Sequence, residues 1–277
     1  MSVPGHLGII AGRGDYPLRL AESAREQGVG RITVLAFRRE TDPAVARWAD
    51  EVVWFRLGKL QPLLDAIRSR GIPEVVMAGQ IRPSALFTVL PDPAMRALLR
   101  RLRARNAETI FGAVAQELAT AGATLRPASL FMEKWMPGPG QITPESPTPE
   151  QWEDIRLGWT VARANSNLDV GQTVVVKEGT VLAVEAFEGT DKAIRRAGRT
   201  GGPGAVIVKV AKDGHDMRFD IPVVGERTLA SARKARAAVL AFEAGRTIVL
   251  DPDRLAAQAA RQGLNLLGLD PAEMNHD

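Results

Sequence analysis

Two acids flank a Gly-Thr turn in the second half of the chain, in the order Glu188-Gly189-Thr190-Asp191. The apolar run before this turn is typical of a strand, and the run after it is typical of a helix. The first amides of a new helix favour an anion such as a phosphate. Carboxylates are compatible with that anion if they hold a divalent cation or accept hydrogen bonds from ribose or sugar hydroxyls. The turn therefore predicts chemistry on a phosphorylated ligand.

The same turn has a purely structural interpretation. Thr190 suits a helix N-cap, and Asp191 in the first helical turn is favoured by the helix dipole. That interpretation explains neither Glu188, which precedes a glycine, nor Glu185, which in a regular strand would share the apolar face.

Asp220 is a further acid among apolar neighbours, in Phe219-Asp220-Ile221-Pro222. Pro222 ends any central strand pairing, and Gly225 precedes the start of a helix. A half-buried carboxylate at such a junction is commonly either a helix cap or a catalytic group, and the sequence leaves both open.

A glycine-containing turn, Gly12-x-Gly14-x-x-Pro17, follows the first predicted strand. Glycines there could bring backbone amides close to a phosphate, or the segment could be a tight turn with proline at the first helical position. As a dinucleotide fingerprint it is imperfect, because Pro17 replaces the third glycine. The second strand also ends in Phe37-Arg38-Arg39, without the acid that binds ribose.

A second such turn, Gly79-Gln80-Ile81-Arg82, follows the strand predicted at 74–78. Ligands of open α/β sheets gather beyond the carboxyl ends of the strands. The guanidinium of Arg82 could grip a phosphate there, or it could be an ordinary surface arginine.

The composition limits the chemistry that these residues could perform. The chain has 277 residues, no cysteine, three histidines and a net charge of +4. Disulfides, thiolate catalysis, cysteine zinc sites and a Ser-His-Asp triad are therefore disfavoured. Aromatic residues make up only 5%, so we expect no nucleic-acid partner. We also expect no signal peptide and no membrane span.

Strands and helices alternate along the chain, which indicates two α/β domains. Residues 1–136 are predicted to form a Rossmann-like domain with a parallel sheet, and 137–149 a Pro/Gly-rich linker. Residues 150–277 are predicted to form a mixed α/β catalytic domain that includes a hairpin at 173–187 and a long helix at 229–242. Two domains of this kind usually place a site in the cleft between them.

The helix predicted at 93–105 has an apolar stripe, and arginines occupy much of its remaining surface. These arginines are Arg96, Arg100, Arg101, Arg103 and Arg105. Such a helix either lies on an anionic membrane or packs on the sheet with its basic face in water.

Taken together, these segments resemble the LpxI family, the UDP-2,3-diacylglucosamine pyrophosphatases of lipid A biosynthesis. The similarity runs in order over nearly the whole chain and is strongest in the second domain. It rests on Leu7-Gly8-Ile9-Ile10-Ala11-Gly12-x-Gly14-x-x-Pro17, Ala78-Gly79-x-x-Arg82-Pro83, the runs 169–176 and 179–191, Asp220-x-Pro222-x-x-Gly225 and Glu243-Ala244-Gly245.

The resemblance implies a two-domain hydrolase that uses Mg²⁺ or Mn²⁺. It would cleave UDP-2,3-diacylglucosamine by water attack on the α-phosphorus and release UMP and 2,3-diacylglucosamine 1-phosphate (lipid X). The catalytic and metal-binding residues expected from it are Asp220, Glu188 and Asp191. The substrate-binding residues expected are Gly12, Gly14, Gly79, Arg82, Gly189, Thr190 and Gly225.

The resemblance also implies a cytoplasmic enzyme that associates peripherally with the inner membrane, and it leaves a monomer and a homodimer open. Two other functions compete with this interpretation. An NADP-dependent oxidoreductase would use Gly12-x-Gly14 and Arg38-Arg39 but would leave the acids of the second domain without a role. A non-catalytic nucleotide- or lipid-binding module would show no metal-dependent turnover.

Overall fold

The computed structural model describes residues 3–81, 88–103, 107–214, 216–219 and 221–275. The chain divides into two compact units. Unit 1 contains Met1–Glu133 together with Asp216–Asp220, and unit 2 contains Lys134–His215 together with Ile221–Asp277. Each unit is described by itself below.

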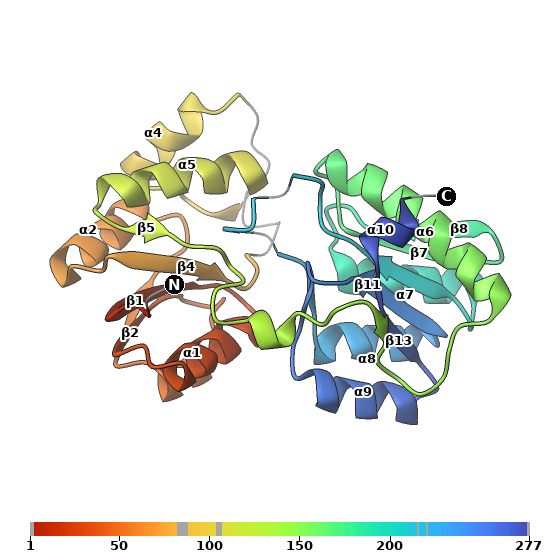
Figure 1. The fold of residues 1–277 in the computed structure, drawn as a ribbon. Coiled ribbons are helices and arrows are strands. Elements are labelled where there is room, and N and C mark those ends of the chain that lie inside the picture. The colour runs from red at the N-terminus through yellow and green to blue at the C-terminus, as the bar shows by residue number, and fades with distance from the viewer. Residues whose placement is uncertain (1–2, 82–87, 104–106, 215, 220, 276–277) are drawn as a thin grey trace. The chain divides into compact units, whose positions relative to one another are not determined.

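Unit 1 is built on a five-stranded sheet in which every pairing is parallel (Figure 1). Its order is β3-β2-β1-β4-β5, which confirms the predicted Rossmann-like parallel sheet. The strands are β1 (His6–Ala11), β2 (Arg31–Phe37), β3 (Glu51–Phe55), β4 (Glu74–Ala78) and β5 (Thr124–Leu125). The helices are α1 (Tyr16–Glu26), α2 (Leu60–Arg70), α4 (Pro93–Arg101) and α5 (Ala107–Thr120), with a 3-10 helix at Pro43–Arg47.

The apolar stripe of α4 packs on the core of unit 1. Leu98 is buried, and Met95, Leu99 and Leu102 are partly buried against the same core. Asp92 caps the helix, because its Oδ1 accepts a hydrogen bond from Met95 N at 2.8 Å. The apolar face of α4 is therefore engaged in the fold, and only its basic face is available to another surface.

A short segment from the second half of the sequence completes the core of unit 1. Phe219 is 3% exposed, and its ring lies 5.9 Å from that of Phe111. The carbonyl of Met217 accepts a hydrogen bond of 2.6 Å from Ala128 N. The chain thus passes from unit 1 to unit 2 after Glu133, returns at Asp216 and leaves again after Asp220. The sequence predicted a single connection.

Unit 2 contains a six-stranded mixed sheet of order β6-β13-β11-β9-β7-β8. Its strands β9, β11 and β13 are parallel, whereas β6 and β7 are antiparallel to their neighbours. The strands are β6 (Gly140–Gln141), β7 (Thr173–Lys177), β8 (Thr180–Val184), β9 (Val206–Lys209), β11 (Val239–Glu243) and β13 (Asn265–Leu269); β10 (Val223–Val224) and β12 (Ile248–Val249) pair separately. β6 lies within the stretch expected to be a linker, and its pairing with β13 joins that stretch to unit 2.

Helices cover both faces of this sheet (Figure 1). On one face α6 (Pro149–Asn167) and α10 (Pro271–Met274) pack against one set of strand side chains. On the other face α7 (Thr190–Gly201), α8 (Glu226–Ala235) and α9 (Pro252–Arg261) pack against the alternate set. Neighbouring residues of β7 show this alternation, since Val174 and Val176 contact the first face and Val175 the second.

The predicted long helix at 229–242 is wrong. α8 ends at Ala235, Arg236 adopts a left-handed conformation with φ of 51°, and β11 follows as a fully buried strand. A short apolar run that is buried on both faces has no period to separate a strand from a buried helix. The predicted hairpin is confirmed, because β7 and β8 pair antiparallel around Glu178 and Gly179, which both have positive φ.

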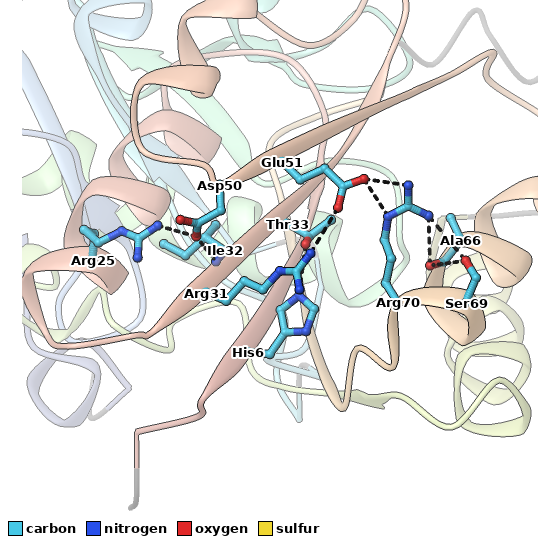
Figure 2. A network of polar contacts seen from close by, with 10 residues as sticks. All are labelled: His6, Arg25, Arg31, Ile32, Thr33, Asp50, Glu51, Ala66, Ser69 and Arg70. Atoms are coloured by element: carbon cyan, nitrogen blue, oxygen red, sulfur yellow. Dashed lines mark hydrogen bonds and ion pairs between the residues drawn. The ribbon is translucent and has the colours of Figure 1, made fainter.

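A network of polar contacts links β2, α1, β3 and α2 near the amino ends of the strands of unit 1 (Figure 2). Asp50, just before β3, accepts hydrogen bonds from Arg25 at 2.5 Å and from Ile32 N at 2.7 Å. Glu51 pairs with Arg70 at 2.6 Å. The backbone donor Ile32 N is the main cause that lowers the pKa of Asp50, and the Arg70 guanidinium is the main cause that lowers the pKa of Glu51.

These lowered pKa values predict acid sensitivity of unit 1. Carboxyls with a folded pKa below the unfolded value stabilise the fold above the unfolded pKa, near pH 4, and this stability is lost as the pH falls through the folded pKa. We expect Glu51→Gln to destabilise the protein at pH 7 by about 0.2–1 kcal/mol, the range for exposed pairs. Its urea midpoint should then fall less than that of the unchanged protein between pH 7 and pH 3. Equal pH dependence of the two midpoints would contradict this role.

Candidate active site

The carboxyl ends of several strands meet at one edge of the sheet in unit 2. β9, β11 and β13 are parallel, and β8 runs in the same direction because both β8 and β9 are antiparallel to β7. This edge carries Glu185 after β8, Lys209 at the end of β9 and Glu243 at the end of β11, and α7 begins there with Thr190. It is the edge at which open α/β sheets bind their ligands.

A buried lysine is the centre of this edge. Lys209 is 4% exposed, and its Nζ donates to Thr190 Oγ1 at 3.0 Å and to Thr173 Oγ1 at 3.3 Å. Thr190 in turn donates from its hydroxyl to Glu185 Oε1 at 2.9 Å. The second carboxylate oxygen, Glu185 Oε2, is buried and has no hydrogen-bond partner among the described residues. Sequence reasoning missed Lys209; the available signal was a charged residue ending the apolar run Val206-Ile207-Val208.

The two acids of the Glu188-Gly189-Thr190-Asp191 turn are both engaged by arginines. Glu188 pairs with Arg196 at 2.5 Å, and this hydrogen bond is the main cause that lowers the pKa of Glu188. Asp191 pairs with Arg227 of α8 at 3.0 Å. The turn is thus a contact that fixes the start of α7 and joins it to α8.

The backbone of this turn explains its glycine. Gly189 is the N-cap of α7 and has φ of 83°, a left-handed conformation that glycine adopts without strain. Thr190 is the first residue of the helix, so the expected N-cap role of Thr190 is wrong by one position. Its hydroxyl contacts Lys209 and Glu185 instead.

The expected metal site remains a prediction, because Asp220, one of its three ligands, lies outside the described residues. No group of three or more histidine, aspartate or glutamate side chains suited to a metal ion occurs in the part of the chain that the structure describes. Glu188 and Asp191 already have arginine partners, so a divalent cation would have to displace an ion pair at each. Asp220, the third expected ligand, lies outside the described residues, between buried Phe219 and buried Ile221.

The two glycine turns of unit 1 contact each other at the carboxyl ends of β1 and β4. Gly12 N donates to Ala78 O at 2.7 Å, and Arg13 N donates to Gln80 O at 2.8 Å. A Cβ at Gly12 would lie 2.6 Å from Gln80 O, and one at Gly79, where φ is 85°, would lie 2.5 Å from Arg13 O. These glycines therefore permit close approach of two loops, and the Gly12 amide is already engaged.

The remaining predicted residues of the site are more open or lie elsewhere. Gly14 has φ of 90°, and a Cβ at this position would meet no atom of the described residues within 4 Å. Gly225 is the N-cap of α8 in an extended conformation. Arg82 lies outside the described residues.

The end of β2 itself carries no acid that could bind ribose, but an acid, Glu40, follows a few residues later. Glu40 is 8% exposed, and its Oε2 lies 3.6 Å from Arg13 Nε. It comes three residues after the last residue of β2, beyond Phe37-Arg38-Arg39.

A surface cavity of about 400 Å³ lies at the opposite, amino edge of the sheet in unit 2. Residues 236–238, just before β11, and 262–264, just before β13, contribute to its lining together with Arg233. It contains none of the buried polar groups described above, so we place the candidate site at the carboxyl edge.

The fold and the position of the site are those of two-domain α/β proteins with a ligand site at the carboxyl edge of a sheet. Two α/β units place amides, hydroxyls and charged side chains at the carboxyl edges of their sheets, as proteins that bind nucleotides and other phosphorylated ligands do. Family models match both units: the LpxI N-terminal domain matches residues 6–135, and the LpxI C-terminal domain matches residues 138–267. The chain therefore belongs to the LpxI family.

A curated relative supports this assignment. The chain is 32% identical to the UDP-2,3-diacylglucosamine pyrophosphatase LpxI of Caulobacter vibrioides over 278 aligned residues, which cover 96% of this chain and 98% of the relative. Among solved structures, the biotin carboxylase subunit of pyruvate carboxylase is similar at a TM-score of 0.28 and 13% identity, over 67% of this chain and 38% of that one. A similarity this low carries no conclusion about function.

Proposed function

We propose that this protein hydrolyses the pyrophosphate bond of UDP-2,3-diacylglucosamine in lipid A biosynthesis. The observation that carries the proposal is the match to a UDP-2,3-diacylglucosamine pyrophosphatase over 96% of the chain, together with family-model matches to both units. The edge of unit 2 that holds Lys209 and the start of α7 supports it, since these groups suit a ligand that carries phosphates and sugar hydroxyls.

In the proposed reaction, water attacks the α-phosphorus on the uridine side. The new P–O bond places the oxygen of water in UMP, and the bridging oxygen leaves with 2,3-diacylglucosamine 1-phosphate. In this proposal a carboxylate accepts a proton from the attacking water. Asp220 is our candidate for that base, because it matches the Asp-x-Pro-x-x-Gly motif of the family. Glu188 and Asp191 would support the site by fixing the start of α7, since arginines pair with both acids.

We also propose that turnover requires a divalent cation, with Mg²⁺ or Mn²⁺ preferred. Carboxylates are the plentiful ligands in a chain without cysteine and with three histidines, and carboxylate oxygens suit these ions. The described acids alone do not provide a metal site, so we assign no step to the ion.

The first test measures UMP release from UDP-2,3-diacylglucosamine. We expect release with Mg²⁺ or Mn²⁺ and loss of nearly all of it after exhaustive chelation, with recovery when Mg²⁺ is added back. Full activity after chelation would refute the cation requirement. Absence of UMP release under every ionic condition would refute the proposed function itself.

The second test concerns Asp220. We expect Asp220→Ala to lower the rate by at least about 100-fold, the lower end for a lost general base. Asp220→Asn should be nearly as slow, because an amide keeps the shape but accepts no proton. Rates are to be expressed per folded molecule, because the neighbours Phe219 and Ile221 are buried. Normal turnover per folded molecule in both variants would show that Asp220 is structural.

We further propose that the protein associates peripherally with the cytoplasmic face of the inner membrane, where its lipid substrate lies. None of the described helices is long and apolar enough to cross a bilayer. The exposed basic face of α4 would supply electrostatic attraction to anionic lipid. We expect replacement of Arg100, Arg101 and Arg103 by glutamine to weaken binding to anionic vesicles at low salt. Unchanged binding would show that this face is only solvated.

A further inference from the structure

At the carboxyl edge of unit 2, the carboxylate of Glu185 has one oxygen that is available to accept a hydrogen bond from a ligand. Thr190 donates a hydrogen bond to its Oε1, whereas Oε2 is buried and no atom in the described part of the chain donates to it. A buried carboxylate oxygen without a donor is costly, so such an atom usually marks a missing partner. Glu185 and Thr190 are only half-buried, so this group lies just below the surface.

The neighbours of Glu185 limit what the missing partner can be. A phosphate is disfavoured directly at Oε2, because two anions would meet there. A divalent cation is disfavoured because Lys209, which is linked to Glu185 through Thr190, already brings a positive charge. Among the described residues, Glu185 also belongs to no group of three or more acids or histidines that could hold a metal ion. A neutral hydroxyl fits, since it can donate to Oε2 and carries no charge.

We propose that Glu185 binds a sugar hydroxyl of the substrate, through a hydrogen bond from that hydroxyl to Oε2. Lys209 and Thr190 act as positioning residues: the ammonium donates to the Thr190 hydroxyl, and this hydroxyl donates to Oε1 and orients the carboxylate. The inference rests on the proposed function, because a nucleotide sugar supplies the hydroxyls. These belong either to the ribose of the UMP half or to the glucosamine ring of the lipid X half.

The test measures the affinities of UMP and of lipid X separately, by calorimetry, for the unchanged protein and for Glu185→Gln. Loss of a hydrogen bond to a charged group should weaken binding of one of the two products by about 10- to 100-fold and leave the other unchanged. The affected product identifies the sugar. Glu178→Gln is the matched control: Glu178 lies in the β7–β8 turn with a side chain that is 84% exposed, and its loss should change neither affinity.

A second pair of variants covers the case in which Glu185→Gln does not fold. Thr190→Ser keeps the hydroxyl that orients Glu185 and should retain the affinity, whereas Thr190→Val should weaken the same product. If UMP is that product, 2′-deoxy-UMP or 3′-deoxy-UMP should bind more weakly than UMP to the unchanged protein, and Glu185→Gln should no longer distinguish them.

The outcomes separate the two proposals. If the unchanged protein releases UMP but Glu185→Gln, or Thr190→Val in its place, binds both products with unchanged affinity, the inference about Glu185 is wrong and the proposed function stands. If the unchanged protein shows neither turnover nor binding of UMP and lipid X, the proposed function is wrong, and this inference fails with it.

Discussion

The buried ammonium of Lys209 is the constraint on which the candidate site depends. Taking a charge out of water is expensive unless polar groups surround it. Two threonine hydroxyls meet this lysine at the end of β9, and no carboxylate among the described residues pairs with it. One hydroxyl belongs to Thr190, the first residue of α7, so the position of the lysine and the start of that helix are fixed together. Gly189 allows the chain to enter the helix at this point through its positive φ. The open oxygen of Glu185 is a consequence of the same arrangement.

Arginines form ion pairs with several acids near Lys209, and these paired acids stabilise the fold of unit 2. Arg196 holds Glu188 within the α7 segment, and Arg227 holds Asp191 from α8. At the end of β11, buried Glu243 accepts from Ala211 N at 2.7 Å and pairs with Arg163 at 3.1 Å, which fixes the chain as it leaves β9. Glu188 and Asp191, the two acids that flank the Gly-Thr turn, are therefore already neutralised by arginines. The groups left for a ligand are the less conspicuous ones at the sheet edge.

Much of the fold follows from the sequence, because the strands of unit 1 are short apolar runs separated by amphipathic helices with clear ends. The failures have a physical cause. Val239-Leu240-Ala241-Phe242 is buried on both faces, so its pattern has no period and a helix was predicted where β11 lies. The acidic turn was correctly placed between a strand and a helix. The arginines that neutralise its two acids are Arg196 and Arg227, and Arg227 lies 36 residues away from Asp191 in the sequence. Long-range pairing of this kind, like the contact between Lys209 and Thr190, is not encoded in any local pattern.

The chain passes from unit 1 back to unit 2 between positions 220 and 221. Phe219 belongs to the core of unit 1, whereas Ile221 is buried and belongs to unit 2. Before this segment, Glu243 accepts a hydrogen bond from Ala211 N and Arg246 donates one to Lys212 O. The two neighbours of position 220 thus belong to different units. Substitutions in this segment will act on packing as well as on chemistry, because loss of a buried aromatic side chain such as Phe219 costs about 3–5 kcal/mol. A role for the family motif Asp-x-Pro-x-x-Gly in catalysis therefore has to be judged at unchanged stability. By contrast, Glu185, Thr190 and Lys209 lie within unit 2 alone, so their contribution to binding can be separated from the connection between the units.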